Sequence, residues 1–171
     1  MIKVYLETER LLIAELSMDM AEVIQRNSLD DDNRRFVPDE VFETVEEARE
    51  TVACLIEARH TETGPFVFAL ILKKDGSNIG YVQTCRTENE WEIGYHIAKA
   101  YAGNGYATEA VCAFAPVVIR RLKVSGLLGI ALAENHASCR VLEKCGFTLL
   151  FSGMNLYQGQ PQMIRKYWFE A

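Results

Sequence analysis

The segment Trp91-Glu92-Ile93-Gly94-Tyr95-His96-Ile97 has the alternating pattern of a β-strand, and a glycine turn with a helix follows it at residues 102–110. In a strand, Ile93 and Tyr95 point to one face, whereas Glu92 and His96 point to the other. A strand inside a helix-covered sheet is normally apolar on both faces. The carboxylate and the imidazole therefore indicate a face that opens onto a cleft, although a solvated face would give the same pattern.

The turn reads Ala102-Gly103-Asn104-Gly105-Tyr106-Ala107-Thr108. Glycines between a strand and a helix let the backbone approach an anion, and the free N–H groups at the start of the helix can hold phosphate. The turn is neither a Walker loop nor a dinucleotide fingerprint. Taken alone, it is also compatible with a plain connection from strand to helix.

A third motif starts at Asn135-His136-Ala137-Ser138 and ends at Leu142-Glu143-Lys144-Cys145-Gly146-Phe147. Asn135 can cap a helix that Gly146 ends.

The rest of the chain also divides into elements by its hydrophobic pattern. We expect strands at 10–16, 66–73, 79–86, 90–98, 127–133, 147–152 and 162–169, helices at 18–25, 44–59, 106–123 and 135–145, and a loop at 30–33. Pro116 should kink or split the long helix. This order predicts an α/β layered domain with a mixed sheet.

The composition limits the class of protein. The chain has 171 residues with 18 Lys and Arg against 24 Asp and Glu, a net charge of −6, which predicts a single domain over residues 1–171 and argues against a nucleic-acid surface. The five cysteines form no CxxC motif and have no paired histidines, so we expect reduced thiols and no metal. The sequence shows neither a signal peptide nor an apolar run long enough to span a membrane, which indicates a cytoplasmic protein.

Together, the polar-faced strand, the glycine turn, Asn-x-x-Ser and Glu-Lys-x-Gly-Phe resemble the GNAT superfamily of acetyl-CoA-dependent N-acetyltransferases, in its RimJ/RimL-like branch. The likeness extends to Leu6-Glu7-Thr8-Glu9-Arg10-Leu11-Leu12 near the start and to Phe68-Ala69-Leu70 and Gly80-Tyr81. The resemblance implies the GNAT fold, with a mixed, largely antiparallel central sheet and helices on both faces. It implies acetyl-CoA as co-substrate and leaves a homodimer open.

The resemblance also implies which residues contact the cofactor. The backbone of Tyr95, His96 and Ile97 would pair with the pantetheine arm, and Asn135 would meet it across a split between two central strands. The phosphate turn would comprise Ala102, Gly103, Asn104, Gly105, Tyr106, Ala107 and Thr108. Ala102 stands where the family usually has Gln or Arg, so we expect weaker cofactor binding at this point.

Acetyl transfer to an amine needs a base, because alkylamines are mostly protonated at neutral pH. Glu92 is the candidate base, and it matches a catalytic glutamate of several relatives. Many relatives also place a tyrosine acid where this chain has Leu142, so the nearest hydroxyl, Ser138, becomes the candidate acid. Cys139 and Cys145 have no evident base partner, which disfavours an acyl-enzyme route.

The acceptor is less defined by the sequence. The leading interpretation is a protein N-terminal α-amine or a small-molecule amine. The run Asp30-Asp31-Asp32 could attract a cationic amine, which keeps an aminoglycoside- or polyamine-type acetyltransferase open, although a solvated acidic loop is the simpler interpretation. Ala102 and Leu142 favour a third alternative, a non-catalytic acyl-CoA-binding module.

Overall fold

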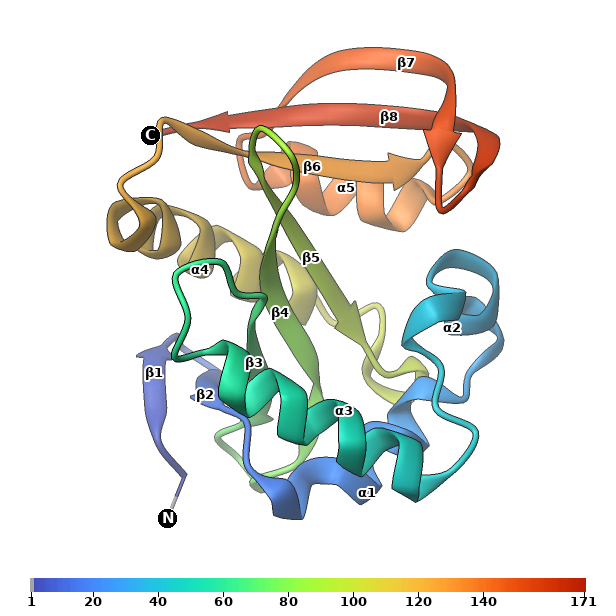
Figure 1. Ribbon diagram of the computed structural model, residues 1–171. Coiled ribbons are helices and arrows are strands. Elements are labelled where there is room, and N and C mark those ends of the chain that lie inside the picture. Colours follow the sequence, from blue (N-terminus) through green and yellow to red (C-terminus); the bar gives the residue numbers. More distant parts are fainter. Residues whose placement is uncertain (1) are drawn as a thin grey trace.

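The computed structural model describes residues 2–171, which form one eight-stranded sheet with helices on both faces (Figure 1). The strand order is β1-β2-β3-β4-β5-β6-β8-β7, and every neighbouring pair is antiparallel except β5 and β6. The predicted mixed, largely antiparallel sheet is therefore confirmed. The strands are β1 (Val4–Glu7), β2 (Leu11–Glu15), β3 (Phe66–Leu72), β4 (Asn78–Arg86), β5 (Trp91–Ile97), β6 (Gly126–Leu132), β7 (Thr148–Tyr157) and β8 (Gln160–Glu170).

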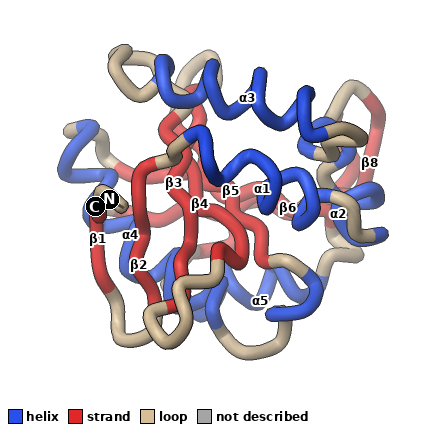
Figure 2. Tube along the Cα trace, turned by 90° about the horizontal axis from the view of Figure 1, so that it is seen from below, coloured by secondary structure: helices blue, strands red, loops and turns tan. Residues whose placement is uncertain are grey.

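The helices form two layers, with α1 (Ala21–Ser28) and α3 (Val45–Ala58) on one face of the sheet and α4 (Tyr106–Leu122) and α5 (His136–Lys144) on the other (Figure 2). Strand β3 lies between the layers and is apolar on both faces. Its Phe68 and Leu70 join the larger core beneath α4, whereas Ala69 and Ile71 pack in the smaller core beneath α1 and α3. A strand covered on both sides needs this continuous apolar run.

Local sequence signals explain where two of the helices begin. Thr44 forms a capping box with Glu47 at the start of α3, because its hydroxyl accepts a hydrogen bond from the Glu47 amide. The side chain of Asn135 accepts a hydrogen bond from the Ser138 amide at the start of α5. Each cap satisfies a backbone donor that has no partner within its helix.

The parallel pair β5–β6 is short. The two strands are aligned only at Glu92 with Leu128 and at Ile93 with Gly129, and they diverge beyond that point (Figure 1). Gly129 lacks a side chain where Leu142 of α5 fills the space, since a Cβ there would lie 2.6 Å from a Leu142 methyl. The close packing of α5 on β6 and the divergence of β5 from β6 together open a split in the sheet.

The N-terminal segment fastens the start of α4 to the sheet. The Thr8 hydroxyl donates a hydrogen bond of 2.5 Å to Glu109, and the Arg10 guanidinium donates one of 2.6 Å to the same carboxylate. Arg10 also donates to the Asn104 carbonyl at 3.0 Å and lies over the ring of Tyr106. Burial raises the pKa of Glu109, but these hydrogen bonds outweigh it and hold the pKa below its usual value. We call these contacts the Arg10–Glu109 clamp.

One expectation about the elements was wrong, one was wrong in part, and one strand was missed. Residues 30–33 are not a loop, because the Asp30 side chain caps a short helix, α2 (Asp31–Phe36), by accepting a hydrogen bond from the Asn33 amide. Of the two effects expected of Pro116, a split of α4 does not occur, because the helix is continuous over seventeen residues. Strand β1 was not predicted; its short segment is ordered by pairing with β2, a tertiary contact.

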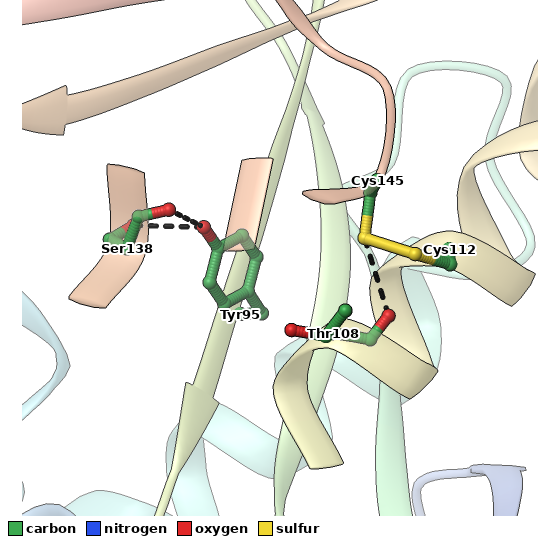
Figure 3. Close-up of a disulfide and its surroundings, with 5 residues drawn as sticks. All are labelled: Tyr95, Thr108, Cys112, Ser138 and Cys145. Carbon is green, nitrogen blue, oxygen red and sulfur yellow. Dashed lines mark hydrogen bonds between the residues drawn. A yellow bond between two sulfur atoms is a disulfide. The ribbon is translucent and has the colours of Figure 1, made fainter. Parts of the chain in front are cut away.

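The expectation of five reduced cysteines was also wrong. Cys112 in α4 and Cys145 at the end of α5 form a disulfide, with Cα atoms 4.9 Å apart (Figure 3). The partners are 33 residues apart in the sequence, and only the packing of α4 against α5 brings them together. Cys54, Cys85 and Cys139 are free.

Among residues 2–171, no helix is both long and apolar enough to cross a membrane. The same residues contain no cluster of three or more His, Cys, Asp or Glu side chains arranged to hold a metal ion.

The cap of α3 provides a test of this fold. Replacement Thr44→Ala removes the side-chain oxygen that the Glu47 amide needs, so we expect a loss of about 1 kcal/mol in the free energy of unfolding. Urea denaturation followed by circular dichroism measures this loss. Thr44→Ser retains the oxygen and should stay within a few tenths of a kcal/mol of the original protein; equal losses in both variants would contradict the capping role.

Candidate active site

Two cavities meet at the split between β5 and β6. The larger, about 520 Å³, lies between the end of β5, the glycine turn and α5, and we call it the turn cleft. The smaller, about 190 Å³, lies between the diverging strands and contains Glu40 and Glu92, and we call it the carboxylate pocket. The residues that border both are Phe36, Val37, Tyr95, Asn135 and Ser138. A molecule that fills the turn cleft can therefore reach a second molecule in the carboxylate pocket.

The glycine turn forms one wall of the turn cleft. Gly103 and Gly105 both have φ near +78°, a conformation that favours glycine, and Gly105 directly precedes α4. The first N–H groups of a helix have no partners within the helix. The turn therefore presents backbone donors and the positive end of a helix dipole, as a phosphate site requires.

The free edge of β5 forms a second wall. Because β6 is aligned only with Glu92 and Ile93, the backbone from Gly94 to Ile97 has no strand partner on the β6 side. Tyr95, His96 and Ile97 line the turn cleft. An extended, amide-containing chain in the cleft can pair with these backbone groups as an added strand would.

Three cations and two carboxylates complete the turn cleft. Lys99, Arg140 and Lys144 line it, and so do Asp30 and Asp32. The cations, together with the glycine turn, give the cleft the donor set that a phosphate-bearing ligand needs. The residues present thus fit coenzyme A, with phosphate donors at the turn and a free strand edge for the pantetheine arm.

Glu92 lies in the carboxylate pocket, opposite Cys85 on β4. Burial raises the pKa of its carboxyl to about 7, and the charge of Lys166 opposes this rise only partly. A carboxyl with this pKa exists in both protonation states near neutral pH, which suits a general base. The predicted alternation of β5 is confirmed, because Ile93 and Tyr95 pack toward the larger core on the opposite face.

Glu40 is a second carboxylate in the same pocket. Its Oε1 accepts a hydrogen bond of 3.0 Å from the Gln83 amide, while its Oε2 is buried without a partner. Burial raises the pKa of Glu40 despite the hydrogen bond from Gln83. Tyr157 lies close to both carboxyl groups, and burial together with their charges raises its pKa to about 12. The pocket is therefore suited to a cationic ligand.

The hydroxyls of Ser138 and Tyr95 lie at the boundary of the two cavities. The Ser138 Oγ is 2.8 Å from the Tyr95 hydroxyl, which also donates to the Ser138 carbonyl at 3.0 Å (Figure 3). Burial raises the pKa of Tyr95, so its hydroxyl remains protonated at neutral pH. The sequence indicated Ser138 as a hydroxyl source and Tyr95 only as a backbone contact; the structure places both hydroxyls together.

His96 and Asp30 form a pair at the other end of β5. The Nε2 of His96 lies 3.4 Å from Asp30, and burial lowers the pKa of the imidazole more than the acidic neighbours raise it. His96 is therefore mainly neutral at pH 7. The sequence left open that the Asp30–Asp32 run attracts a cationic amine. Asp30 and Asp32 line the turn cleft and do not line the carboxylate pocket.

Leu142 has a packing role. Its side chain is 1% exposed and fills the space over Gly129, which removes it from both cavities. Ala102 lines the turn cleft with only a methyl group. Asn135 borders both cavities, but its side-chain oxygen is engaged as the cap of α5.

The sequence did not indicate several residues that the structure brings to the site. Glu40 and Gln83 come from separate segments and meet only in the folded chain, and Tyr157 reaches the pocket from the end of the β7–β8 hairpin. No short motif marks them. Lys99, Arg140 and Lys144 could have been found as cations flanking the recognised motifs.

Comparisons with known proteins agree with this geometry. A family model described as an acetyltransferase (GNAT) domain matches residues 10–148. The chain is 26% identical over 144 residues to YnaD of Bacillus subtilis, named as an uncharacterized N-acetyltransferase, covering 83% of this chain and 81% of that protein.

Solved structures show the same fold. A GNAT-family acetyltransferase from Bacillus anthracis superposes with a TM-score of 0.82 at 24% identity, covering 99% of this chain and 98% of that one. RimL, a ribosomal L7/L12 α-N-protein acetyltransferase in complex with coenzyme A, superposes with a TM-score of 0.81 at 16% identity, covering 98% of each chain. The family model matches most of the chain, and the glycine turn before α4 and the split sheet agree with it. This chain therefore belongs to the GNAT family of acetyl-CoA-dependent acetyltransferases.

Proposed function

We propose that this chain transfers the acetyl group of acetyl-CoA directly to a primary amine that binds in the carboxylate pocket, with Glu92 as the general base. The single observation that supports this most strongly is the position of Glu92. It is a half-buried carboxyl with a pKa of about 7 in a pocket that joins the turn cleft. The acceptor is a protein N-terminal α-amine, as in the RimL-type neighbours, or a small-molecule amine.

The proposal assigns acetyl-CoA, which supplies an activated acetyl thioester, to the turn cleft. Residues Ala102 to Thr108 would hold its phosphates, with Lys99, Arg140 and Lys144 as additional cations. The free edge of β5 at Tyr95, His96 and Ile97 would pair with the pantetheine arm, next to Asn135. Backbone N–H groups at this edge are fixed in position, so they can stabilise negative charge without reorganisation.

Two proton transfers are assigned to side chains. Glu92 accepts a proton from the acceptor ammonium, which frees the nitrogen lone pair. The Ser138 hydroxyl, supported by the Tyr95 hydroxyl 2.8 Å away, donates a proton toward the departing thiolate. The proposal treats residues 1–171 as one catalytic domain that acts in the cytoplasm, and it leaves a homodimer open.

The variant Glu92→Gln tests the assignment of the base. Loss of the base should lower kcat by about 10²–10⁴-fold and remove the limb near pH 7 from the pH profile of kcat. Turnover of an amine substrate measured from pH 5.5 to 9 checks this. An unchanged pH profile in the variant would exclude Glu92 as the base.

The same variant has an expected effect on stability. Folding raises the pKa of Glu92, so this carboxyl stabilises the folded chain fully only when the pH is below its pKa in the unfolded chain. That contribution is lost as the pH rises through the folded-state pKa of about 7. Glu92→Gln should therefore raise Tm relative to the original protein at pH 8.5 and much less at pH 5. A Tm gain of about 2–4 °C at pH 8.5 would correspond to about 1 kcal/mol in a chain of this length. Such a gain together with lost turnover separates a catalytic role from misfolding.

Variants of Ser138 test the assignment of the acid. Ser138→Ala should lower kcat by about tenfold or more with little change in the KM for acetyl-CoA, because the hydroxyl acts only as the thiolate leaves. Ser138→Thr retains a hydroxyl and should retain most of the turnover. Full activity of the alanine variant would move the acid role to Tyr95 or to water, and Tyr95→Phe would then distinguish these.

The variant Arg10→Ala tests the Arg10–Glu109 clamp. Arg10 holds the glycine turn through the Asn104 carbonyl, so Arg10→Ala should weaken coenzyme A binding by about three- to tenfold through lost preorganisation. Isothermal titration calorimetry with coenzyme A measures this. Arg26→Ala removes an exposed cation on α1 and is the matched control. If both variants weaken coenzyme A binding equally, the loss comes from the change in net charge and the clamp has no specific role.

A further inference from the structure

A third cavity, of about 310 Å³, lies on the α1–α3 face of the sheet between these helices and strands β3 and β4. It shares Asn33 and His96 with the turn cleft but has no part in the base and acid assignments, and we call it the apolar cavity. Six aliphatic and aromatic side chains form much of its wall: Leu16, Ile24, Phe42, Val52, Leu55 and Val67. Its volume is at the lower end of the range of small-molecule sites.

The apolar cavity adjoins the carboxylate pocket. Asp39, Glu40, Tyr81 and Gln83 border both cavities, so the Glu40–Gln83 pair stands at their junction. Gly94 of β5 makes this arrangement possible, because a Cβ there would lie 2.9 Å from the Gln83 amide nitrogen. The absence of a side chain at Gly94 lets the Gln83 side chain lie across β5 and hold Glu40 in place.

We propose that the acceptor is a primary amine with an uncharged, mainly apolar arm, whose ammonium group binds Glu40 and whose arm occupies the apolar cavity. This inference rests on the proposed function, because it assigns the acceptor of the same site. Glu40 is the specificity-determining residue, and Gln83 is a positioning residue that acts through it. The Oε2 of Glu40 is buried without a partner and can accept an N–H from the ammonium as a charge-assisted hydrogen bond.

The two carboxylates then have different tasks. Of the three ammonium protons, Glu92 takes one, and another is held by the Oε2 of Glu40. The nitrogen lone pair forms the C–N bond to the acetyl carbon as the C–S bond breaks. The thiolate receives a proton from the Ser138 hydroxyl, which regains one from the amine nitrogen through water, and the products are an amide and a thiol. No oxidant or reductant is required.

The walls of the apolar cavity disfavour a polycation. A second ammonium group in this cavity would lose its hydration among aliphatic side chains, which is costly for an unpaired charge. The Oδ1 of Asn33 and the Nδ2 of Asn78 are buried without partners at this cavity, and they can pair with an uncharged polar group on the arm. The geometry therefore favours an amine with an apolar side chain over a polyamine or an aminoglycoside.

The experiment compares acceptors with the full chain and acetyl-CoA. Leucinamide and phenylalaninamide represent α-amines with apolar arms, phenethylamine is a free amine of the same kind, glycinamide lacks an arm, and spermidine is a polycation. We expect kcat/KM for leucinamide and phenethylamine to exceed that for glycinamide and spermidine by tenfold or more. A higher value for leucinamide than for phenethylamine would identify a peptide N-terminus as the source, and the reverse would identify a free amine. Preference for spermidine or glycinamide would overturn the inference.

Two phenylalanine substitutions on α3 localise the arm. Thr51 borders the apolar cavity, whereas Cys54 on the same helix is exposed. Thr51→Phe fills part of the cavity and should lower kcat/KM for leucinamide at least tenfold while glycinamide changes less than twofold. Cys54→Phe adds the same bulk to solvent and should change neither. An equal effect of Thr51→Phe on both acceptors, or no effect on leucinamide, would contradict the assignment.

Glu40→Gln tests the ammonium site. It should raise the KM for amine acceptors about tenfold and leave the KM for acetyl-CoA unchanged. An unchanged acceptor KM would remove Glu40 from the site.

Binding distinguishes failure of this inference from failure of the proposed function. Calorimetry with phenethylamine and coenzyme A requires no turnover. If no amine is acetylated but phenethylamine binds and Thr51→Phe abolishes that binding, the proposed function fails and the cavity assignment stands. If amines are acetylated but Thr51→Phe leaves phenethylamine binding intact, the cavity assignment fails alone.

Discussion

The divergence of β5 from β6 is the constraint on which the rest of this structure depends. Two parallel strands that share only two aligned residue pairs leave backbone groups unpaired from Gly94 onward. An unpaired, partly buried strand edge is unfavourable unless a ligand or water satisfies it. The open edge thus offers unpaired backbone groups to a ligand, and α4 and α5 hold the two strands in this position by packing on the same face of the sheet.

The packing of α5 keeps the split open and places the hydroxyls of Ser138 and Tyr95 beside each other. Leu142 packs over Gly129, which sets α5 close to β6. The first turn of α5 then presents Ser138 to the Tyr95 hydroxyl at the boundary of the two cavities. The position that a tyrosine occupies in many relatives is part of the core here, and a hydroxyl from β5 lies beside Ser138 in its place.

The electrostatics of the site follow from burial. The net charge of −6 does not prevent an anion site, because the glycine turn offers backbone donors and three cations line the turn cleft. The acidic character matters at the carboxylate pocket, where burial raises the pKa of both Glu40 and Glu92. Two carboxyl groups with raised pKa values in one pocket can hold an ammonium group and also accept its proton.

The local sequence determined what depends on near neighbours. The alternation of β5, the glycine turn before α4 and the caps of α3 and α5 all involve contacts within a few residues, so short patterns predicted them. Only the tertiary structure decided the contacts between distant segments. Glu40 with Gln83, Thr8 and Arg10 with Glu109, and Cys112 with Cys145 each join positions more than 30 residues apart. Their partners are set by how the layers pack, and a linear pattern carries no signal for that packing.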